Sequence, residues 1–406
     1  MQQQCLRIGM LGAGRRGKEH LRSIAALPDL YELAAVCDVS AAAGAAAAPA
    51  GVRVYSSVRD FLASEKLDLV LITTPRETHH IVVKVVAEYG VNMLIETPLA
   101  TTRAMMDVIE EVAANSNLRI EVGENMWRRP AERLNQQAID AGLVGSVVRV
   151  TSYYGPAGGD SCYHMMSLMR HYAGADCEEV RALSQDYDLT GARSETWIQG
   201  FLRYGSGVTG SITYTSDWVS PLRRGHPRLF TVEGTKGFIV TGDCSGHMLR
   251  HVQDGVARDF PKRIETAVVD GREQLVRLYY ETDSVLEYRN PFLGRAADDG
   301  DPRKLYDEVA RASELESIHR AITTGAPPDY SVAKARRDME LSILLTESGR
   351  RREPLAARSD ALGPETEWER RQHDEFRQTY GADPIADIER LIQSADWLGA
   401  SPGGAT

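Results

Sequence analysis

The sequence has little of what disulfide-stapled, membrane-spanning or nucleic-acid-binding proteins need. Its five cysteines are scattered and form no C-x-x-C pair, so neither a disulfide framework nor a zinc site is predicted. No apolar run approaches the roughly 18 residues of a membrane-spanning helix. The formal net charge of -10 disfavours a nucleic acid as partner. We therefore expect a cytoplasmic protein without a membrane or nucleic-acid partner.

What is present is an ordinary globular composition. The chain has 406 residues, of which 43% are hydrophobic and 26% are charged. At about 150 residues per domain, this length favours two or three domains. The first residues run directly into a strand-like stretch, with no charged and apolar leader, so we expect no targeting segment.

From residue 5 to about 124, short apolar runs alternate with helical stretches, a pattern typical of a parallel sheet with crossover helices. Strands are predicted at 6–11, 32–37, 67–72, 92–95 and 118–122, and helices at 15–26, 58–64, 79–89 and 102–115. The alanine-rich stretch 41–50 is interpreted as a helix and loop. We predict an α/β domain over 1–125 with a doubly wound parallel sheet.

Strands dominate the next part of the chain. Runs at 180–189, 196–204, 207–215, 229–232, 237–240 and 247–252 follow one another with glycine-rich turns, as in an antiparallel sheet. We predict an α+β domain over 126–357 with a large open antiparallel sheet. Its late helices, at 304–323 and 331–349, either cover that sheet or return to the first domain. The remainder, 358–406, is predicted to be a charged helical extension.

A G-x-G-x-x-G motif follows the first predicted strand and opens the first predicted helix. Gly12 permits a tight turn, Gly14 lets the backbone approach a pyrophosphate, and Gly17 lets the helix pack closely on the strand. The free N–H groups and the dipole of the helix attract phosphate. We therefore predict a Rossmann domain that binds a dinucleotide. The residues expected at the phosphates are Gly12, Ala13, Gly14, Arg15 and Arg16.

Asp38 ends the second predicted strand, about 20 residues after the glycine motif. A carboxylate there accepts a hydrogen bond from a ribose 2′-hydroxyl but repels a 2′-phosphate. The predicted cofactor is therefore NAD. Ser40 and Arg59 can still reshape the adenosine end, so NADP remains an alternative.

Five further motifs follow the predicted strands or turns: T-P-R-E-T-H at 74–79, E-T-P-L-A at 96–100, G-E-N-M-W-R-R at 123–129, A-G-x-x-G at 141–145 and E-G-T-x-G at 233–237. Together they resemble the motifs of the Gfo/Idh/MocA oxidoreductases, the family of glucose-fructose oxidoreductase and inositol dehydrogenase. With the glycine motif, the resemblance extends over about residues 5 to 355.

The resemblance implies NAD(P) across the carboxyl ends of the first sheet and a carbohydrate or cyclitol substrate held against the second. It also implies a homo-oligomer, either a dimer or a tetramer. Further residues expected to bind or border the cofactor are Thr74, Pro75, His79, Glu96, Thr97 and Asn125.

The sequence departs from the family at a catalytic position. Where the family's E-K-P segment supplies a lysine as acid or base, this chain has Thr97. A threonine hydroxyl cannot store the substrate's proton at neutral pH, whereas a desolvated lysine can. Either another group takes this role or the reaction does not need one.

The family's substrate motif D-x-G-x-H-x-x-D falls on residues 160–167. Asp160 and His164 match it, while Cys162 and Ser167 depart from it. Asp160 is a good helix cap, and residues at i and i+4 share a helix face. We predict His164 as the proton-transfer group, oriented by Asp160, with Tyr163 as a further candidate. Alternatively, Asp160 is only a cap and His164 a core polar residue.

Candidate substrate contacts besides His164 are Trp127, Arg128 and Trp218, because tryptophans can stack on sugars and the family places polar groups after the fifth strand. The alternatives are core packing for the tryptophans and a structural ion pair for Arg128. No histidine has metal-ligand spacing that would predict a metal site.

The function predicted first is an NAD(H)-dependent oxidoreductase acting on a secondary alcohol or ketone of a sugar, cyclitol or glycoside. The second is a redox-neutral enzyme with retained NAD, a glycosidase, eliminase or epimerase that forms a transient 3-keto sugar. The third is a catalytically silent protein that senses dinucleotide or sugar.

Overall fold

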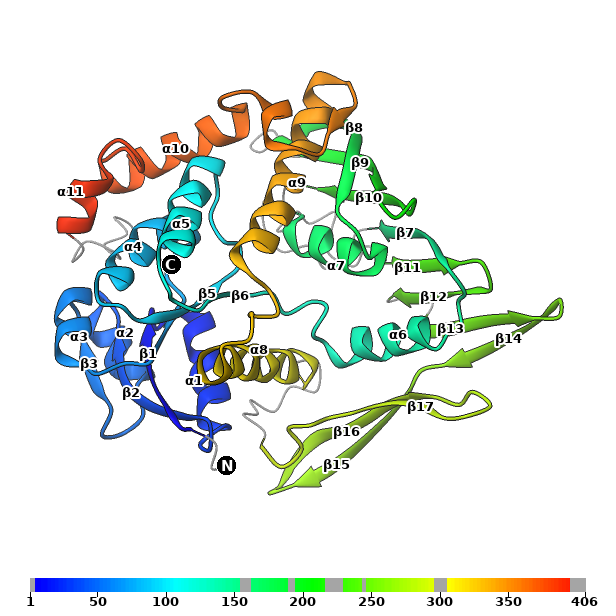
Figure 1. Ribbon diagram of the computed structural model, residues 1–406, viewed down its shortest axis with the longest axis horizontal. Helices are drawn as coiled ribbons and strands as arrows, with labels where there is room; N and C mark the ends of the chain where they lie inside the picture. The colour runs from blue at the N-terminus through cyan, green and yellow to red at the C-terminus, as the bar shows by residue number, and fades with distance from the viewer. Residues whose placement is uncertain are drawn as a thin grey trace. The chain divides into compact units, whose positions relative to one another are not determined.

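The computed structural model describes residues 4–153, 162–188, 194–215, 229–242, 246–295 and 305–394. The chain divides into two compact units (Figure 1). The first comprises Met1–Asn125, Gly294–Arg336 and Glu369–Thr406, and the second Met126–Leu293 and Arg337–Trp368. The chain first leaves the first unit after Asn125.

The first unit is built on a six-stranded parallel sheet with the strand order β3-β2-β1-β4-β5-β6. The strands are β1 (Leu6–Leu11), β2 (Tyr31–Cys37), β3 (Arg53–Tyr55), β4 (Leu69–Ile72), β5 (Asn92–Glu96) and β6 (Ile120–Gly123). The order reverses between β1 and β4, the point at which open α/β sheets bind ligands beyond the carboxyl ends of their strands. The predicted doubly wound sheet is confirmed, with one additional strand: β3 has three residues, too few to leave an apolar pattern in the sequence.

Helices cover this sheet, and its central strands are buried, as parallel sheets require. The helices that follow the strands are α1 (Arg15–Ala25), α2 (Ala41–Ala47), α3 (Val58–Ser64), the 3₁₀ turn η1 (Arg76–Thr78), α4 (His79–Glu88) and α5 (Arg103–Asn115). Three later helices join them: α8 (Leu305–Thr324), α10 (Glu367–Tyr380) and α11 (Ile388–Gln393). Figure 1 shows α8 beside α1, and α10 and α11 beside α5 and α4.

The second unit contains a nine-stranded sheet with the order β14-β13-β12-β11-β7-β10-β9-β8-β18. Its strands are β7 (Val147–Tyr153), β8 (Cys177–Asp188), β9 (Ser194–Tyr204), β10 (Thr209–Thr215), β11 (Leu229–Gly234), β12 (Gly237–Gly242), β13 (Gly246–Gln253), β14 (Val256–Pro261) and β18 (Leu355–Ala356). All pairings are antiparallel except that between β7 and β10. The sheet is therefore mixed rather than purely antiparallel.

One face of this sheet is covered and the other is open. Alternate residues such as Val180, Leu202 and Ile212 are buried, whereas Leu183 and Phe201 on the opposite face are 64% and 63% exposed. The covering helices are α6 (Pro130–Asp140), α7 (Tyr163–Ala173) and α9 (Val332–Arg351), whose first residues belong to the first unit. The short η3 (Ser359–Leu362) follows β18.

A second small sheet was not predicted from the sequence. It has three antiparallel strands, β15 (Arg263–Val269), β16 (Arg272–Tyr280) and β17 (Leu286–Arg289). Charged residues are frequent in these strands, so the apolar pattern that identifies a half-buried strand is weak there. The long helices α8 and α9 lie within one or two residues of their predicted bounds at each end.

Candidate functional site

The glycine loop has the geometry that the motif predicts. Gly12 follows β1 with φ +100°, and a Cβ there would lie 2.8 Å from the Thr73 carbonyl oxygen. A Cβ on Gly17 would lie 2.2 Å from the carbonyl oxygen of Gly12, so helix α1 packs against the loop itself. A Cβ on Gly14 would meet nothing within 4 Å. The protein's own packing therefore explains Gly12 and Gly17, while Gly14 leaves open space at the start of α1.

This space lies at a helix end suited to an anion. Gly14 is the N-cap of α1, and neither a capping side chain nor an acidic residue occupies the first turn. The first N–H groups of a helix lack partners within the helix and carry a partial positive charge. The space and the donors together fit the pyrophosphate of a dinucleotide.

Asp38 lies beside the loop, as predicted. The N–H of Ala13 donates to its Oδ2 (2.7 Å), and the N–H of Ser40 donates to its Oδ1 (2.8 Å). An ionised carboxylate has about four lone-pair positions, so two remain for ribose hydroxyls. The arrangement fits NAD, because a 2′-phosphate would meet this carboxylate's charge.

A buried ion-pair network lies under the end of β5. The Nε of Arg16 donates to Glu96 Oε1 (2.7 Å), and His20 Nε2 bonds to the same oxygen. The N–H of Thr97 donates to the other carboxylate oxygen, Oε2 (3.0 Å). Burial alone would raise the pKa of Glu96, but Arg16 and His20 outweigh it and hold that pKa well below its usual range. Glu96 is therefore an ionised anchor for the Thr97 backbone.

His20 was not recognised from the sequence. Burial lowers its pKa, so the ring is neutral at pH 7. Its Nε2 faces a carboxylate, which assigns the proton to that nitrogen, and its Nδ1 has no partner among the described residues. The sequence does not reveal its contact with Glu96, because the two residues lie 76 positions apart in the chain.

His20, Glu96 and Glu314 of α8 bring possible ligand atoms within 4.8 Å of one another. Two guanidinium groups, however, lie in the same cluster. Arg16 pairs with Glu96, and Arg311 lies 3.6 Å from Glu19. These cations already balance the carboxylates and would repel a divalent ion. We interpret the cluster as an ion-pair network that joins α1, β5 and α8.

His79 joins two loops at the carboxyl edge of the sheet. Its Nε2 lies 3.1 Å from the Thr74 carbonyl oxygen, and its Nδ1 lies 3.1 Å from those of Pro98 and Leu99. Burial lowers its pKa. The side chain thus borders the predicted cofactor region by fixing the loops after β4 and β5, which contain Thr74, Pro75 and Thr97.

The residues predicted at the end of β6 are buried. Asn125 and Trp127 are each 8% exposed, and Arg128 is fully buried. The Trp127 ring stacks on His171, with centroids 5.4 Å apart, and the guanidinium of Arg128 lies 4.6 Å from its centroid. Trp127 therefore has the surroundings of a core residue. Its substrate role and that of Arg128 stay predictions.

His164 lies in the first turn of α7 and is half-buried. The neighbouring Tyr163 ring is 1% exposed and packs edge-on against the imidazole, 5.6 Å away. Helix α7 begins at Tyr163, and its capping position is Cys162. The prediction that Asp160 caps this helix is therefore wrong, and the i, i+4 argument that paired Asp160 with His164 on one helix face does not apply, because the helix begins after Asp160. Asp160 and Trp218 lie outside the described residues, so their proposed contacts with His164 and substrate stay predictions.

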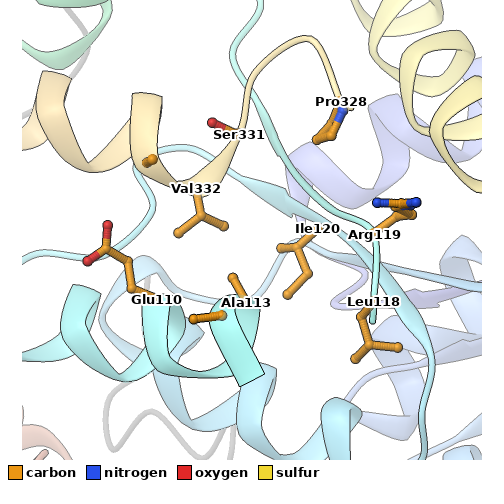
Figure 2. A pocket seen from close by; sticks show the side chains of 10 residues that line it. Glu110, Ala113, Leu118, Arg119, Ile120, Pro328, Ser331 and Val332 are labelled. Carbon is orange, nitrogen blue, oxygen red and sulfur yellow. The ribbon is translucent and has the colours of Figure 1, made fainter. Parts of the chain in front are cut away.

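A separate hollow in the first unit lies away from the carboxyl edge of the sheet (Figure 2). Its volume is about 450 Å³, and Figure 2 shows the side chains of Ala113, Ile120 and Val332 around it. It adjoins the end of α5 and the beginning of β6, which is the opposite edge from the glycine loop. Its mostly apolar lining offers no acid–base group suited to catalysis beyond Glu110 at its margin, which bonds to Arg336.

The first unit matches a known family. Residues 6–124 match the model GFO_IDH_MocA, described as "Oxidoreductase family, NAD-binding Rossmann fold". The rhizopine catabolism protein MocA of Rhizobium meliloti is 31% identical over 202 residues, which cover 46% of this chain and 63% of that protein. Inositol 2-dehydrogenase of Rhizobium meliloti (strain 1021) is 31% identical over 146 residues, covering 36% of this chain and 44% of that protein. The matched part of the chain thus spans less than two thirds of either relative.

Solved structures share the fold over a longer stretch. A levoglucosan dehydrogenase in complex with NADH and L-sorbose has a TM-score of 0.66 at 20% identity, covering 87% of this chain and 99% of that one. A putative myo-inositol dehydrogenase from Sinorhizobium meliloti 1021 has a TM-score of 0.64 at 21% identity, covering 87% of this chain and 100% of that one.

No helix among the described residues is long and apolar enough to cross a membrane. The glycine loop, the placement of Asp38 and the family match agree with one another. They support the similarity of residues 6–124 to the family model GFO_IDH_MocA, "Oxidoreductase family, NAD-binding Rossmann fold".

Proposed function

We propose that this protein is an NAD(H)-dependent oxidoreductase that acts on a secondary alcohol or ketone of a sugar, cyclitol or glycoside. The substrate class is supported by relatives named as inositol and levoglucosan dehydrogenases. In this proposal His164 is the proton-transfer group, aided by Asp160, with Tyr163 as a further candidate.

The observation that carries the proposal is the chemistry at the end of β5. Thr97 stands where the family places a lysine, and the adjacent Glu96 is tied to Arg16, His20 and the Thr97 N–H. A carboxylate held ionised by these partners is a weak base, and a threonine hydroxyl is not a usable one near neutral pH. The proton of the substrate's hydroxyl group must therefore go to a group other than Glu96 or Thr97.

His164 is suited to that role. Imidazole changes protonation near neutral pH and is the commonest general acid or base. Bound NAD⁺ supplies a hydride acceptor, and NADH supplies a hydride donor. In oxidation, His164 takes the proton of the reacting hydroxyl; in reduction, it returns a proton to the ketone oxygen. Arg128 and Trp127 are proposed to shape the substrate side.

The alternative is a redox-neutral enzyme that retains NAD, for which the absence of a lysine at Thr97 is the specific observation. Transient oxidation at C3 acidifies the neighbouring C–H and permits elimination of an aglycone, after which the hydride returns to the sugar. A silent sensor of dinucleotide or sugar would have the same glycine loop and no turnover.

One experiment separates these functions. The purified protein is incubated with NAD⁺ and a panel of sugars, inositols and glycosides while absorbance at 340 nm and product mass are followed together. Net oxidoreduction predicts NADH and oxidised product in equal amounts. Substrate consumption without NADH, with NAD retained through purification, would favour the redox-neutral enzyme. No consumption of any candidate would contradict both enzymatic proposals and leave the sensor.

We also propose a homo-oligomer formed through the open face of the nine-stranded sheet. Leu183 and Phe201, on the adjacent strands β8 and β9, are the large exposed apolar side chains that support it.

A further inference from the structure

The C-terminal helix α10 carries an unusual stripe of side chains. Glu369, His373, Phe376 and Tyr380 are spaced by four, three and four residues, which places them on one helical face. Three of them are buried, and Tyr380 is half-buried. Buried polar side chains such as these need hydrogen-bond or ion-pair partners, because burial without a partner costs free energy.

Glu369 binds the beginning of α5. Its Oε1 accepts from both the backbone N–H and the Nε of Arg103, each at 2.9 Å, and its Oε2 accepts from a terminal nitrogen of that guanidinium (2.6 Å). The Arg103 side chain is 9% exposed and that of Glu369 is 3% exposed. Arg103 is the first residue of α5, where a cation opposes the helix dipole, so the Glu369 carboxylate offsets that charge and caps an otherwise unpaired N–H.

His373 binds the residue just before. Its Nε2 and the Oγ1 of Thr102 form a hydrogen bond of 3.1 Å, and Thr102 is the N-cap of α5. The segment that these two contacts hold begins at Thr97, directly after β5. Helix α10 therefore fixes the far end of the loop whose near end is anchored by Glu96.

Tyr380 reaches the neighbouring loop. Its hydroxyl donates to Glu77 Oε1 (3.2 Å), and Glu77 lies in η1, after β4. Beyond the helix, the Pro384 carbonyl oxygen lies 3.0 Å from His80 Nε2, in the first turn of α4. The Phe376 ring packs against His80 with centroids 6.1 Å apart.

These two loops leave the carboxyl ends of β4 and β5, next to the topological switch point where a dinucleotide binds. His79 lies between them inside the unit, with Nδ1 3.1 Å from the Pro98 carbonyl oxygen and Nε2 3.1 Å from the Thr74 carbonyl oxygen, while α10 contacts both loops from outside. We propose that α10 is a positioning element of the NAD site, and that its stripe sets the geometry of the two loops and thereby the affinity for NAD. This inference rests on the assignment of an NAD-binding domain and not on the identity of the substrate.

The test compares three variants of the full chain by isothermal titration with NAD⁺, well below the temperature at which each unfolds. Glu369→Gln weakens the bonds to Arg103 without changing the size of the side chain. Tyr380→Phe removes only the hydroxyl that meets Glu77. Glu375→Gln is the matched control, because Glu375 is an exposed carboxylate on the same helix, and its hydrogen bond among the described residues is to Gln372 of that helix.

We expect Glu369→Gln to raise the Kd for NAD⁺ about fivefold or more, a typical coupling between distinct sites. Tyr380→Phe should raise it about twofold, as expected from one hydrogen bond. Glu375→Gln should bind like the wild type. If Glu369→Gln does not fold, the Kd of Tyr380→Phe for NAD⁺ alone tests the inference.

Wild-type Kd values for both Glu369→Gln and Tyr380→Phe, even with a lowered melting temperature, would overturn the inference and leave α10 a packing element. A wild-type protein that does not bind NAD⁺ would overturn the inference together with the cofactor assignment, so the two failures are distinguishable.

Discussion

At the scale of single residues, the three glycines of the loop meet different demands that look alike in the sequence. Gly12 and Gly17 are required by backbone conformation and by close approach within the protein, whereas Gly14 borders open space. Only Gly14 is therefore free of intramolecular constraint, and its side-chain position is left for a ligand.

This difference predicts that alanine at Gly17 lowers mainly the stability of the protein, whereas alanine at Gly14 lowers mainly its affinity for NAD⁺. Gly17→Ala should lower the free energy of unfolding by about 1–3 kcal/mol, because the new Cβ overlaps the Gly12 carbonyl oxygen. Gly14→Ala should change stability by about 1 kcal/mol at most, as expected of a helix cap, and weaken NAD⁺ binding at least tenfold. Urea unfolding and isothermal titration measure the two quantities. Unchanged NAD⁺ affinity in Gly14→Ala would contradict the placement of the pyrophosphate.

Single residues also show the limit of sequence analysis. Asp38 could be predicted because the motif and the strand end fix its place. The contacts of Glu96 with His20 and Arg16 could not, because they join residues far apart in the chain whose meeting depends on how α1 packs against the sheet. The roles of Arg311 and Glu314 on α8 could not be predicted either, because their contacts with α1 also join residues far apart in the chain.

At the scale of elements, the long helices were predictable and the short or charged strands were not. Helices α8 and α9 lie within one or two residues of their predicted bounds at each end. Strand β3 and the sheet of β15, β16 and β17 were missed, since a three-residue strand and strands rich in paired charges carry little periodicity.

The open face of the nine-stranded sheet gives a prediction of its own. If it is the contact between subunits, Phe201→Glu should lower the oligomer's mass to that of the monomer, because the carboxylate would be desolvated at the contact. Val268→Glu is the control, since Val268 is 74% exposed on the small sheet instead. Analytical ultracentrifugation measures both. The same mass for wild type and Phe201→Glu would rule out this face.

At the scale of the whole molecule, burial is the chief cause that lowers the pKa of three buried histidines of the first unit, His20, His79 and His80. A base with a lowered pKa in the folded state binds protons more tightly when unfolded. Stability is therefore lost as pH falls below the ordinary histidine value of about 6.5.

His80 provides the measurable case. Burial lowers its pKa to about 4, so it alone should reduce the free energy of unfolding by about 2 kcal/mol between pH 7 and pH 5. His80→Gln keeps a donor for the Pro384 carbonyl oxygen and removes the titration. The free energy of unfolding of this variant, measured with urea, should therefore fall less between pH 7 and pH 5 than that of the wild type, by about 2 kcal/mol. Parallel pH profiles of variant and wild type would refute this account of His80.

In the proposed function, the first unit binds NAD, and the proton-transfer group, His164, lies on α7 of the second unit. The most direct test of this claim is single-turnover reduction of bound NAD⁺, followed at 340 nm, in His164→Asn, Tyr163→Phe and wild type with a substrate found in the panel. We expect His164→Asn to bind NAD⁺ normally but to slow this step about 10²- to 10⁴-fold, while Tyr163→Phe stays near the wild-type rate. A wild-type rate in His164→Asn would exclude His164 as the proton-transfer group.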